Sequence, residues 1–95
     1  TTYELLFPQT KNLRPVIVTT EPGGNYGEIP LGHTGDEFCI ILEGTLEITL
    51  DDETHILHEG DSIYINAFVP HKYRNAGKEK CVSLWVSQGS NEPLD

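Results

Sequence analysis

Hydrophobic and polar residues alternate with a period of two along most of the chain, a pattern typical of half-buried β-strands. Residues 45–50 show it most clearly, because Leu46, Ile48 and Leu50 share one face and polar side chains share the other. Comparable runs occupy residues 15–20, 61–66 and 81–86. Turn-forming segments rich in glycine, proline, asparagine and acidic residues separate these runs. The pattern predicts about eight short strands.

No window has an apolar period of 3.6 long enough for a helix. The sequence therefore predicts an all-β fold, a small β-barrel or jelly roll of the double-stranded β-helix type. Ninety-five residues suit one domain, so we expect residues 1–95 to form a single unit. Its core is expected at about residues 4–87, followed by a loosely packed tail at 88–95.

The segment 37–44 departs from simple alternation because it is apolar on both faces. Cys39 and Ile41 share the side of Glu37, whereas the hydrophobic residues between them face the other way. A strand that is apolar on both sides is normally covered on both sides. Either the N-terminal segment 3–7 or a second copy of the chain is expected to supply the outer cover, and the second option predicts a homodimer.

The formal net charge of −9 argues against direct contact of this domain with nucleic acid. No apolar run is long enough to cross a bilayer, so no membrane association is expected. Cys39 and Cys81 lie in apolar strand-like runs and are interpreted as buried thiols in a reducing, cytoplasmic setting, although their spacing leaves a disulfide open. The chain begins at Thr1 and contains no methionine, which suggests a piece of a longer protein.

Histidine and carboxylate positions indicate a metal site. His33 and Glu37 share a face and can converge across a turn, and His71 supplies a second imidazole. Two imidazoles and one carboxylate form a three-ligand set with open positions, suited to Zn, Fe, Mn, Ni or Cu. A metal-free, hydrogen-bonded polar cluster is the alternative. His55 and His58 lie in a polar segment and are expected to be exposed.

Two blocks within residues 33–77 resemble the paired motifs of the cupin family. Glu37 and Gly44 are separated by six residues as in the end of the first motif, and Gly60, His71 and Asn75 match the spacing of the second. Counting back from Glu37 places His33 at the second family histidine and Leu31 at the first. Counting forward from Gly27 instead makes His33 the first histidine, but that register puts Glu37 and Gly44 out of phase. Asn66 and Phe68 stand where the second motif has proline and glycine.

The resemblance implies a divalent metal ion held by His33, Glu37 and His71, with Leu31 in the place of a fourth ligand. It also implies a small-molecule pocket inside the barrel, for which we predict a lining of Leu31, Cys39, Ile41, Tyr73 and Trp85. Asn75 is interpreted as a structural turn residue, and no residue is assigned a catalytic role.

A narrower resemblance covers most of residues 4–86, which are similar to the C-terminal cupin domains of bacterial helix-turn-helix regulators of the XRE type. The shared features include the stretches "EPGG" at 21–24 and "HTGDE" at 33–37. This resemblance implies a domain that senses a small-molecule effector, with DNA contacted only by a separate N-terminal domain. A stand-alone metal-dependent enzyme, of the dioxygenase or isomerase type, is the alternative.

Overall fold

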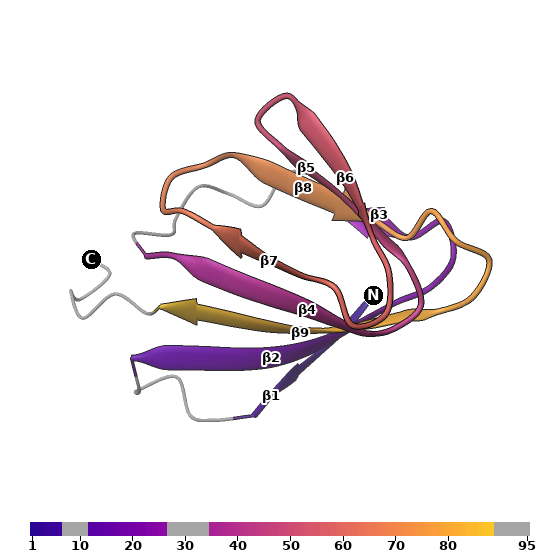
Figure 1. Ribbon diagram of the computed structural model, residues 1–95. Coiled ribbons are helices and arrows are strands. Elements are labelled where there is room, and N and C mark those ends of the chain that lie inside the picture. Colours follow the sequence, from indigo (N-terminus) through magenta and orange to yellow (C-terminus); the bar gives the residue numbers. More distant parts are fainter. Residues whose placement is uncertain (7–11, 27–34, 89–95) are drawn as a thin grey trace.

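The computed structural model describes residues 1–6, 12–26 and 35–88 (Figure 1). Every regular element within these ranges is a β-strand. The described residues accordingly include no helix long and apolar enough to cross a membrane. Gln88, the first residue of the tail expected at 88–95, belongs to the last strand, and residues 89–95 lie outside the described residues.

Nine strands are present in this part of the chain, one more than the hydrophobic pattern predicts. Their bounds are β1 Thr2–Leu5, β2 Leu13–Thr20, β3 Asn25–Tyr26, β4 Glu37–Glu43, β5 Leu46–Leu50, β6 Glu53–Leu57, β7 Ser62–Ile65, β8 His71–Arg74 and β9 Cys81–Gln88. The N-terminal strand β1 has four residues that are all exposed and show no alternation of burial. The acidic turn between β5 and β6 forms a hairpin.

The strands form two antiparallel sheets that face each other (Figure 1). One sheet has the order β1-β2-β9-β4-β7 and the other has the order β3-β8-β5-β6. Neighbours such as β4 and β9 are far apart in sequence, so the chain repeatedly crosses between the sheets, as in a jelly roll. The predicted all-β fold is confirmed.

The core lies between the two sheets and draws on both. Leu46 and Ile48 of β5 are fully buried, as the alternation of that strand requires. Cys39 and Ile41 of β4 face them from the other sheet, with exposed fractions of 0% and 1%. Cys39 and Cys81 are both free and buried, so the structure contains no disulfide between them.

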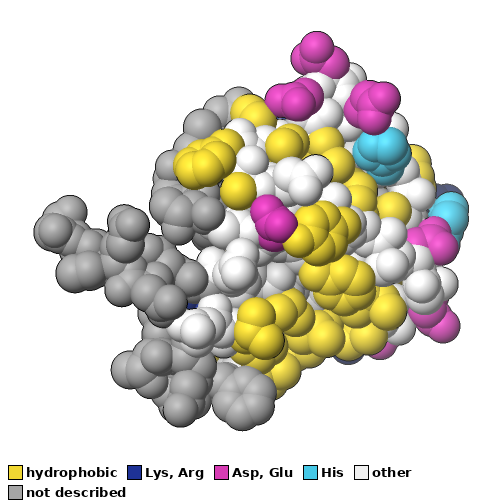
Figure 2. Space-filling model, turned by 60° about the vertical axis from the view of Figure 1, so that its left-hand side comes forward, with side chains coloured by type: hydrophobic (Ala, Val, Ile, Leu, Met, Phe, Trp, Pro, Cys, Tyr) yellow, Lys and Arg dark blue, Asp and Glu magenta, His cyan; other side chains and the backbone are white. Residues whose placement is uncertain are grey.

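The outer face of the larger sheet is apolar but only partly covered. Phe38 and Ile40 of β4 are half-buried, while Leu42 and the neighbouring Tyr64 of β7 are exposed. Over Thr2–Leu5, the N-terminal segment pairs edge to edge with β2 and does not cover this face. Figure 2 shows a continuous patch of hydrophobic side chains in its lower part, with most carboxylates toward the upper and right-hand edges.

Two family-motif residues hold turns that the fold requires. Gly44 joins β4 to β5 with φ of +86°, and a Cβ at this position would lie 2.5 Å from the Lys80 carbonyl oxygen. Gly60 also has a positive φ, +89°, but no atom lies within 4 Å of its Cβ direction. Gly44 is therefore required by backbone conformation and by space, and Gly60 by conformation alone.

Asn75 acts as a buried connector between three backbone segments. Its side-chain nitrogen donates to the carbonyl oxygens of Thr20 at 2.9 Å and Glu79 at 2.7 Å. Its side-chain oxygen accepts the Gly77 amide at 2.9 Å. Asn75 is 1% exposed, and the contacts agree with its interpretation as a structural residue.

Candidate functional site

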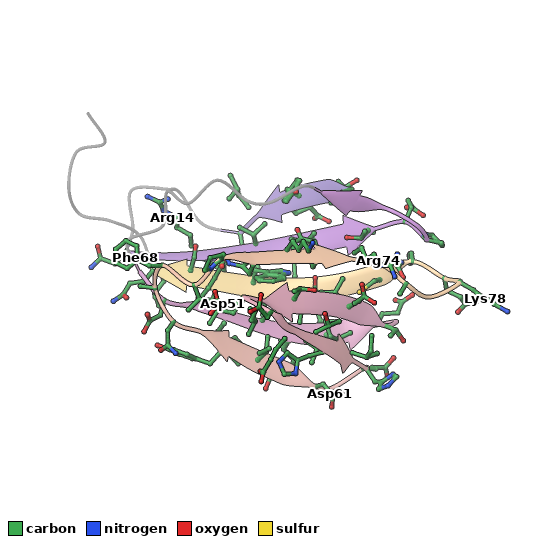
Figure 3. The ribbon with its side chains drawn as sticks, turned by 90° about the horizontal axis from the view of Figure 1, so that it is seen from above. Arg14, Asp51, Asp61, Phe68, Arg74 and Lys78 are labelled. Atoms are coloured by element: carbon green, nitrogen blue, oxygen red, sulfur yellow. The ribbon has the colours of Figure 1, made fainter. Side chains whose placement is uncertain are left out.

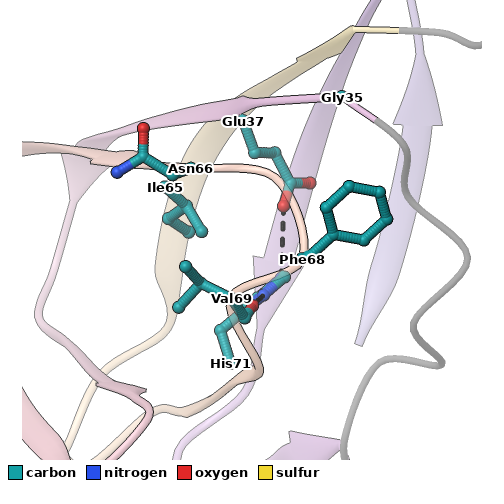
Figure 4. Close-up of a pocket in the computed structure, with 7 residues that line it drawn as sticks. All are labelled: Gly35, Glu37, Ile65, Asn66, Phe68, Val69 and His71. Carbon is teal, nitrogen blue, oxygen red and sulfur yellow. Dashed lines mark hydrogen bonds and ion pairs between the residues drawn. The ribbon is translucent and has the colours of Figure 1, made fainter.

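Glu37 and His71 meet at one end of the space between the sheets. Glu37 is the first residue of β4 and His71 is the first residue of β8, so each sheet contributes one of them. Glu37 Oε1 lies 3.1 Å from His71 Nε2, and the side chains are only 11% and 6% exposed (Figure 4). The structure thus brings together two of the three predicted metal ligands in a buried position.

The hydrogen bond of Nδ1 of His71 determines whether Nε2 is a donor or an acceptor in the neutral ring. Nδ1 lies 3.0 Å from the Val69 carbonyl oxygen, which can only accept, so Nδ1 carries a hydrogen. In the neutral ring, Nε2 would then present a lone pair to the Glu37 carboxylate at 3.1 Å. Two facing acceptors repel each other, and the arrangement therefore requires either a proton or a metal ion between or beside them.

Protonation of His71 follows from the same contacts. The hydrogen bond with the Glu37 carboxylate raises the pKa of His71 above its ordinary value, and the Val69 carbonyl and the negative charge of Glu37 act in the same direction. Burial opposes this change because it disfavours the charged ring. Without a metal, His71 therefore keeps its second proton to a higher pH than an ordinary histidine does.

A small cavity adjoins the pair. Its volume is about 10 Å³, and its lining comprises Gly35, Glu37, Ile65, Asn66, Phe68, Val69 and His71 (Figure 4). A cavity of this size accepts one water molecule or one ion, but no organic molecule. An organic effector would have to bind outside it, at the mouth of the barrel.

The loop at 66–70 forms one wall of this cavity and is anchored to the start of β4. Asp36 accepts hydrogen bonds from the Ala67 amide, at 2.8 Å, and from the Tyr64 hydroxyl. The Tyr64 hydrogen bond, with the Ala67 amide as a smaller cause, lowers the pKa of Asp36 below its ordinary value. These contacts keep the loop beside Glu37.

Phe68 lies at the tip of this loop in a conformation that side chains rarely adopt. Its φ is +69°, in the left-handed region that favours glycine, and 70% of its surface is exposed. Phe68 thus adopts a backbone conformation that glycine favours, while placing a phenyl ring at the cavity mouth. Phe68 was not among the predicted site residues, although its place at a motif glycine was a usable signal.

Four of the predicted pocket residues belong to the core: Cys39, Ile41, Tyr73 and Trp85. None of them lines the cavity beside Glu37. Trp85 links them to the site, since its ring stacks on Tyr73 with centroids 5.1 Å apart and on His71 at 6.4 Å. Burial raises the pKa of the Cys39 thiol, which keeps it neutral and unsuited to bind a metal as a thiolate.

His33 and Leu31 lie outside the described residues. Among residues 1–6, 12–26 and 35–88, no three histidine, cysteine or acidic side chains converge as a metal-binding group. The third ligand therefore stays a prediction. The other two histidines lie away from the pair, His58 exposed and His55 with a 41% exposed side chain beside Glu53.

Comparisons with known sequences agree with the motifs. A family model described as a cupin domain matches residues 16–87. The xanthan biosynthesis protein XanB of Xanthomonas campestris is 34% identical over 73 residues, which make up 77% of this chain and 15% of that protein. The HTH-type transcriptional regulator PuuR of Escherichia coli is 31% identical over 71 residues, 75% of this chain and 38% of the regulator. The chain thus spans less than half the length of either relative.

Solved structures show the same architecture. The cupin domain of an XRE-family transcriptional regulator from Enterobacter cloacae has a TM-score of 0.84 at 21% identity, covering 95% of this chain and 97% of that one. This likeness is evidence of the fold. The structure of Fe(II) HppE has a TM-score of 0.78 at 25% identity. The match covers 90% of this chain and 48% of the HppE chain.

Proposed function

The chain belongs to the cupin family, and we propose that it is the sensing domain of a bacterial transcription regulator, located in the cytoplasm. In this proposal an effector binds at the mouth of the barrel, near a divalent metal ion. The relationship to an HTH-type regulator supports the regulatory half of the proposal. The observation that carries the sensing half is the buried Glu37–His71 pair, 3.1 Å apart beside a cavity the size of one ion.

The residues present fit a metal ion. Two ligand atoms about 2.1 Å from one ion and at right angles to each other are about 3.0 Å apart. The observed separation of Glu37 Oε1 and His71 Nε2 is close to that value. Nδ1 of His71 is engaged by the Val69 carbonyl, which orients the ring as an outer partner does in many metal sites. We propose that His33 supplies the third ligand and that the ion is Zn, Fe, Mn, Ni or Cu.

Metal loading tests this part of the proposal directly. After dialysis against a divalent ion and removal of the excess, elemental analysis should find about one ion per wild-type chain and far less in Glu37→Gln and His71→Ala. His55→Ala is the matched control, because it removes an imidazole that is partly exposed and distant from the pair. Equal metal contents in all four proteins would refute the assignment of Glu37 and His71 as ligands.

We propose further that the domain forms a homodimer through the outer face of the larger sheet. This face carries Phe38 and Ile40 on β4 and Leu84 on β9, none of which contributes to the core. Because β1 lies at the edge of this sheet, Thr2–Leu5 does not cover the outer face. Sedimentation should show a dimer for wild type and a folded monomer for Leu84→Lys, while Thr49→Lys, on the outer face of the other sheet, should remain dimeric.

A stand-alone metal-dependent enzyme is the second candidate, favoured by the likeness to Fe(II) HppE. The two proposals differ in what surrounds the domain in its complete gene. A helix-turn-helix segment encoded upstream in the same reading frame supports the sensor. A reading frame that encodes the cupin domain alone supports the enzyme or a lone binding protein.

A further inference from the structure

We infer that Arg14 forms an anion subsite at the mouth of the barrel and that it binds a carboxylate group of the effector. This inference deepens the proposed function and rests on it, because it specifies the chemistry of the ligand for the same site. Arg14 was not among the predicted site residues. The sequence placed the start of its strand at Pro15, whereas β2 begins at Leu13.

Strand register places Arg14 on the inner face, in one row with Glu37. Arg14 pairs with Ser87 of β9, and Ser87 pairs on its other side with Glu37 of β4. Residues directly opposite each other on neighbouring strands point to the same side of a sheet. Val16 and Val18, which follow Arg14 at intervals of two, pack in or against the core, so the row faces inward.

Arg14 is close enough to Glu37 to serve the same ligand. Two strand spacings separate their backbones, about 10 Å in total, and Ser87 lies between them with a hydroxyl that can also donate. Figure 3 shows Arg14 at the same end of the molecule as Phe68, the residue at the cavity mouth. A ligand at the mouth would thus contact Arg14 on one side and Phe68 and Glu37 on the other.

Among the described residues, no acceptor contacts the Nε of Arg14. Its Nε is buried and has no hydrogen-bond partner, and no carboxylate of the described residues forms an ion pair with it. Glu37, the acid in the same row, is engaged by His71. A buried donor of a charged group without an acceptor is unfavourable, and an anionic ligand would remove this cost.

Arg74 provides an internal comparison. It is the other arginine of the chain, and its Nε donates to Glu47 at 2.6 Å with a second contact at 3.3 Å. This exposed arginine has a carboxylate partner, whereas the partly buried one at the barrel mouth does not. The difference singles out Arg14 as the arginine that is ready to accept a ligand.

The charge of the domain narrows the class of ligand to a carboxylate. A net charge of −9 disfavours anions in general, and it disfavours the doubly charged phosphate more than the singly charged carboxylate. The planar carboxylate also matches the two parallel N–H groups of a guanidinium. We therefore expect binding of carboxylates and much weaker binding of inorganic phosphate.

Acetate is the probe, followed by NMR of the arginine Nε–H signals in metal-free, ¹⁵N-labelled protein at constant ionic strength. The chain contains two arginines, so two such signals are expected. Acetate should shift the Arg14 signal saturably and leave the Arg74 signal in place, whereas sodium chloride should shift neither. Backbone signals of Ser87 and Glu37 should report an affinity at least tenfold lower in Arg14→Gln and intermediate in Arg14→Lys. Arg74→Gln is the matched control and should bind acetate as wild type does.

Unsaturable or equal shifts of the two arginine signals would overturn the inference, as would unchanged acetate affinity in Arg14→Gln. Tighter binding of phosphate than of acetate would overturn the assignment to a carboxylate. Because the titration uses metal-free protein, its result is independent of metal loading. Acetate binding without metal binding refutes the metal proposal alone, and metal binding without an acetate site refutes the Arg14 subsite alone.

Discussion

Asn75→Ala should destabilise the domain more than any other asparagine substitution in the described residues. The change removes a side chain that donates to the Thr20 and Glu79 carbonyls and accepts from the Gly77 amide. Thr20 is 1% exposed, so water cannot replace the lost donor there, and a buried unsatisfied group costs about 1–3 kcal/mol. Glu79 is exposed and Gly77 partly so, and each of these bonds is worth about 0.5–1.5 kcal/mol. We expect a total loss of about 3 kcal/mol.

Urea unfolding measures this loss. A domain of this length has a total stability of roughly 5–14 kcal/mol, so the change removes a large fraction of it. With an m-value of about 1.5 kcal/mol/M, the unfolding midpoint should fall by about 2 M. Asn66→Ala is the control, because Asn66 is exposed and should change stability by no more than about 0.5 kcal/mol. Equal midpoints for the two variants would show that the Asn75 contacts do not hold the turn.

Three further predictions test the backbone and the buried pair. Gly44→Ala should destabilise the domain by several kcal/mol through strain and a clash, whereas Gly60→Ala should cost only about 1–2 kcal/mol, since only its φ is unfavourable; the two urea midpoints compare them. At position 68, glycine should be more stable than alanine by about 1 kcal/mol, the reverse of an ordinary site, and thermal unfolding of Phe68→Gly and Phe68→Ala measures the sign. In metal-free protein, the raised pKa of His71 contributes stability that is complete below its unfolded pKa of about 6.5 and is lost as pH rises through the folded value. Glu37→Gln should lower the pKa of His71 in an NMR titration and flatten that pH dependence.

The all-β fold could be predicted because its strands are buried on one side. The alternation at Leu46, Ile48 and Leu50 matches the burial of β5. β1 shows the limit of this signal, because all four of its residues are exposed and leave no pattern of burial in the sequence. Its pairing with β2 extends the sheet at its edge, so Thr2–Leu5 does not cover the outer face.

The site could be predicted only in part, because motif spacing identifies ligands but not the surroundings that control them. Glu37 and His71 were predicted and lie 3.1 Å apart. The Val69 carbonyl that fixes the tautomer of His71 is a backbone group, and no side-chain motif encodes it. Arg14 was missed because proline is typical of a strand start, so its inward orientation became evident only from its register with Ser87.

The contacts of His71 link metal binding to pH. The ring nitrogen that faces Glu37 is the atom that would bind a metal, and without metal it holds a proton that the carboxylate stabilises. A metal ion must displace this proton, so its apparent affinity should fall as pH decreases through the raised pKa of His71. The side chain of His55 is 41% exposed and its neighbour Glu53 is 80% exposed, so loss of His55 should leave this pH dependence unchanged. Protons and metal ions should therefore compete for the same atom of His71, and Glu37 would stabilise either of them there.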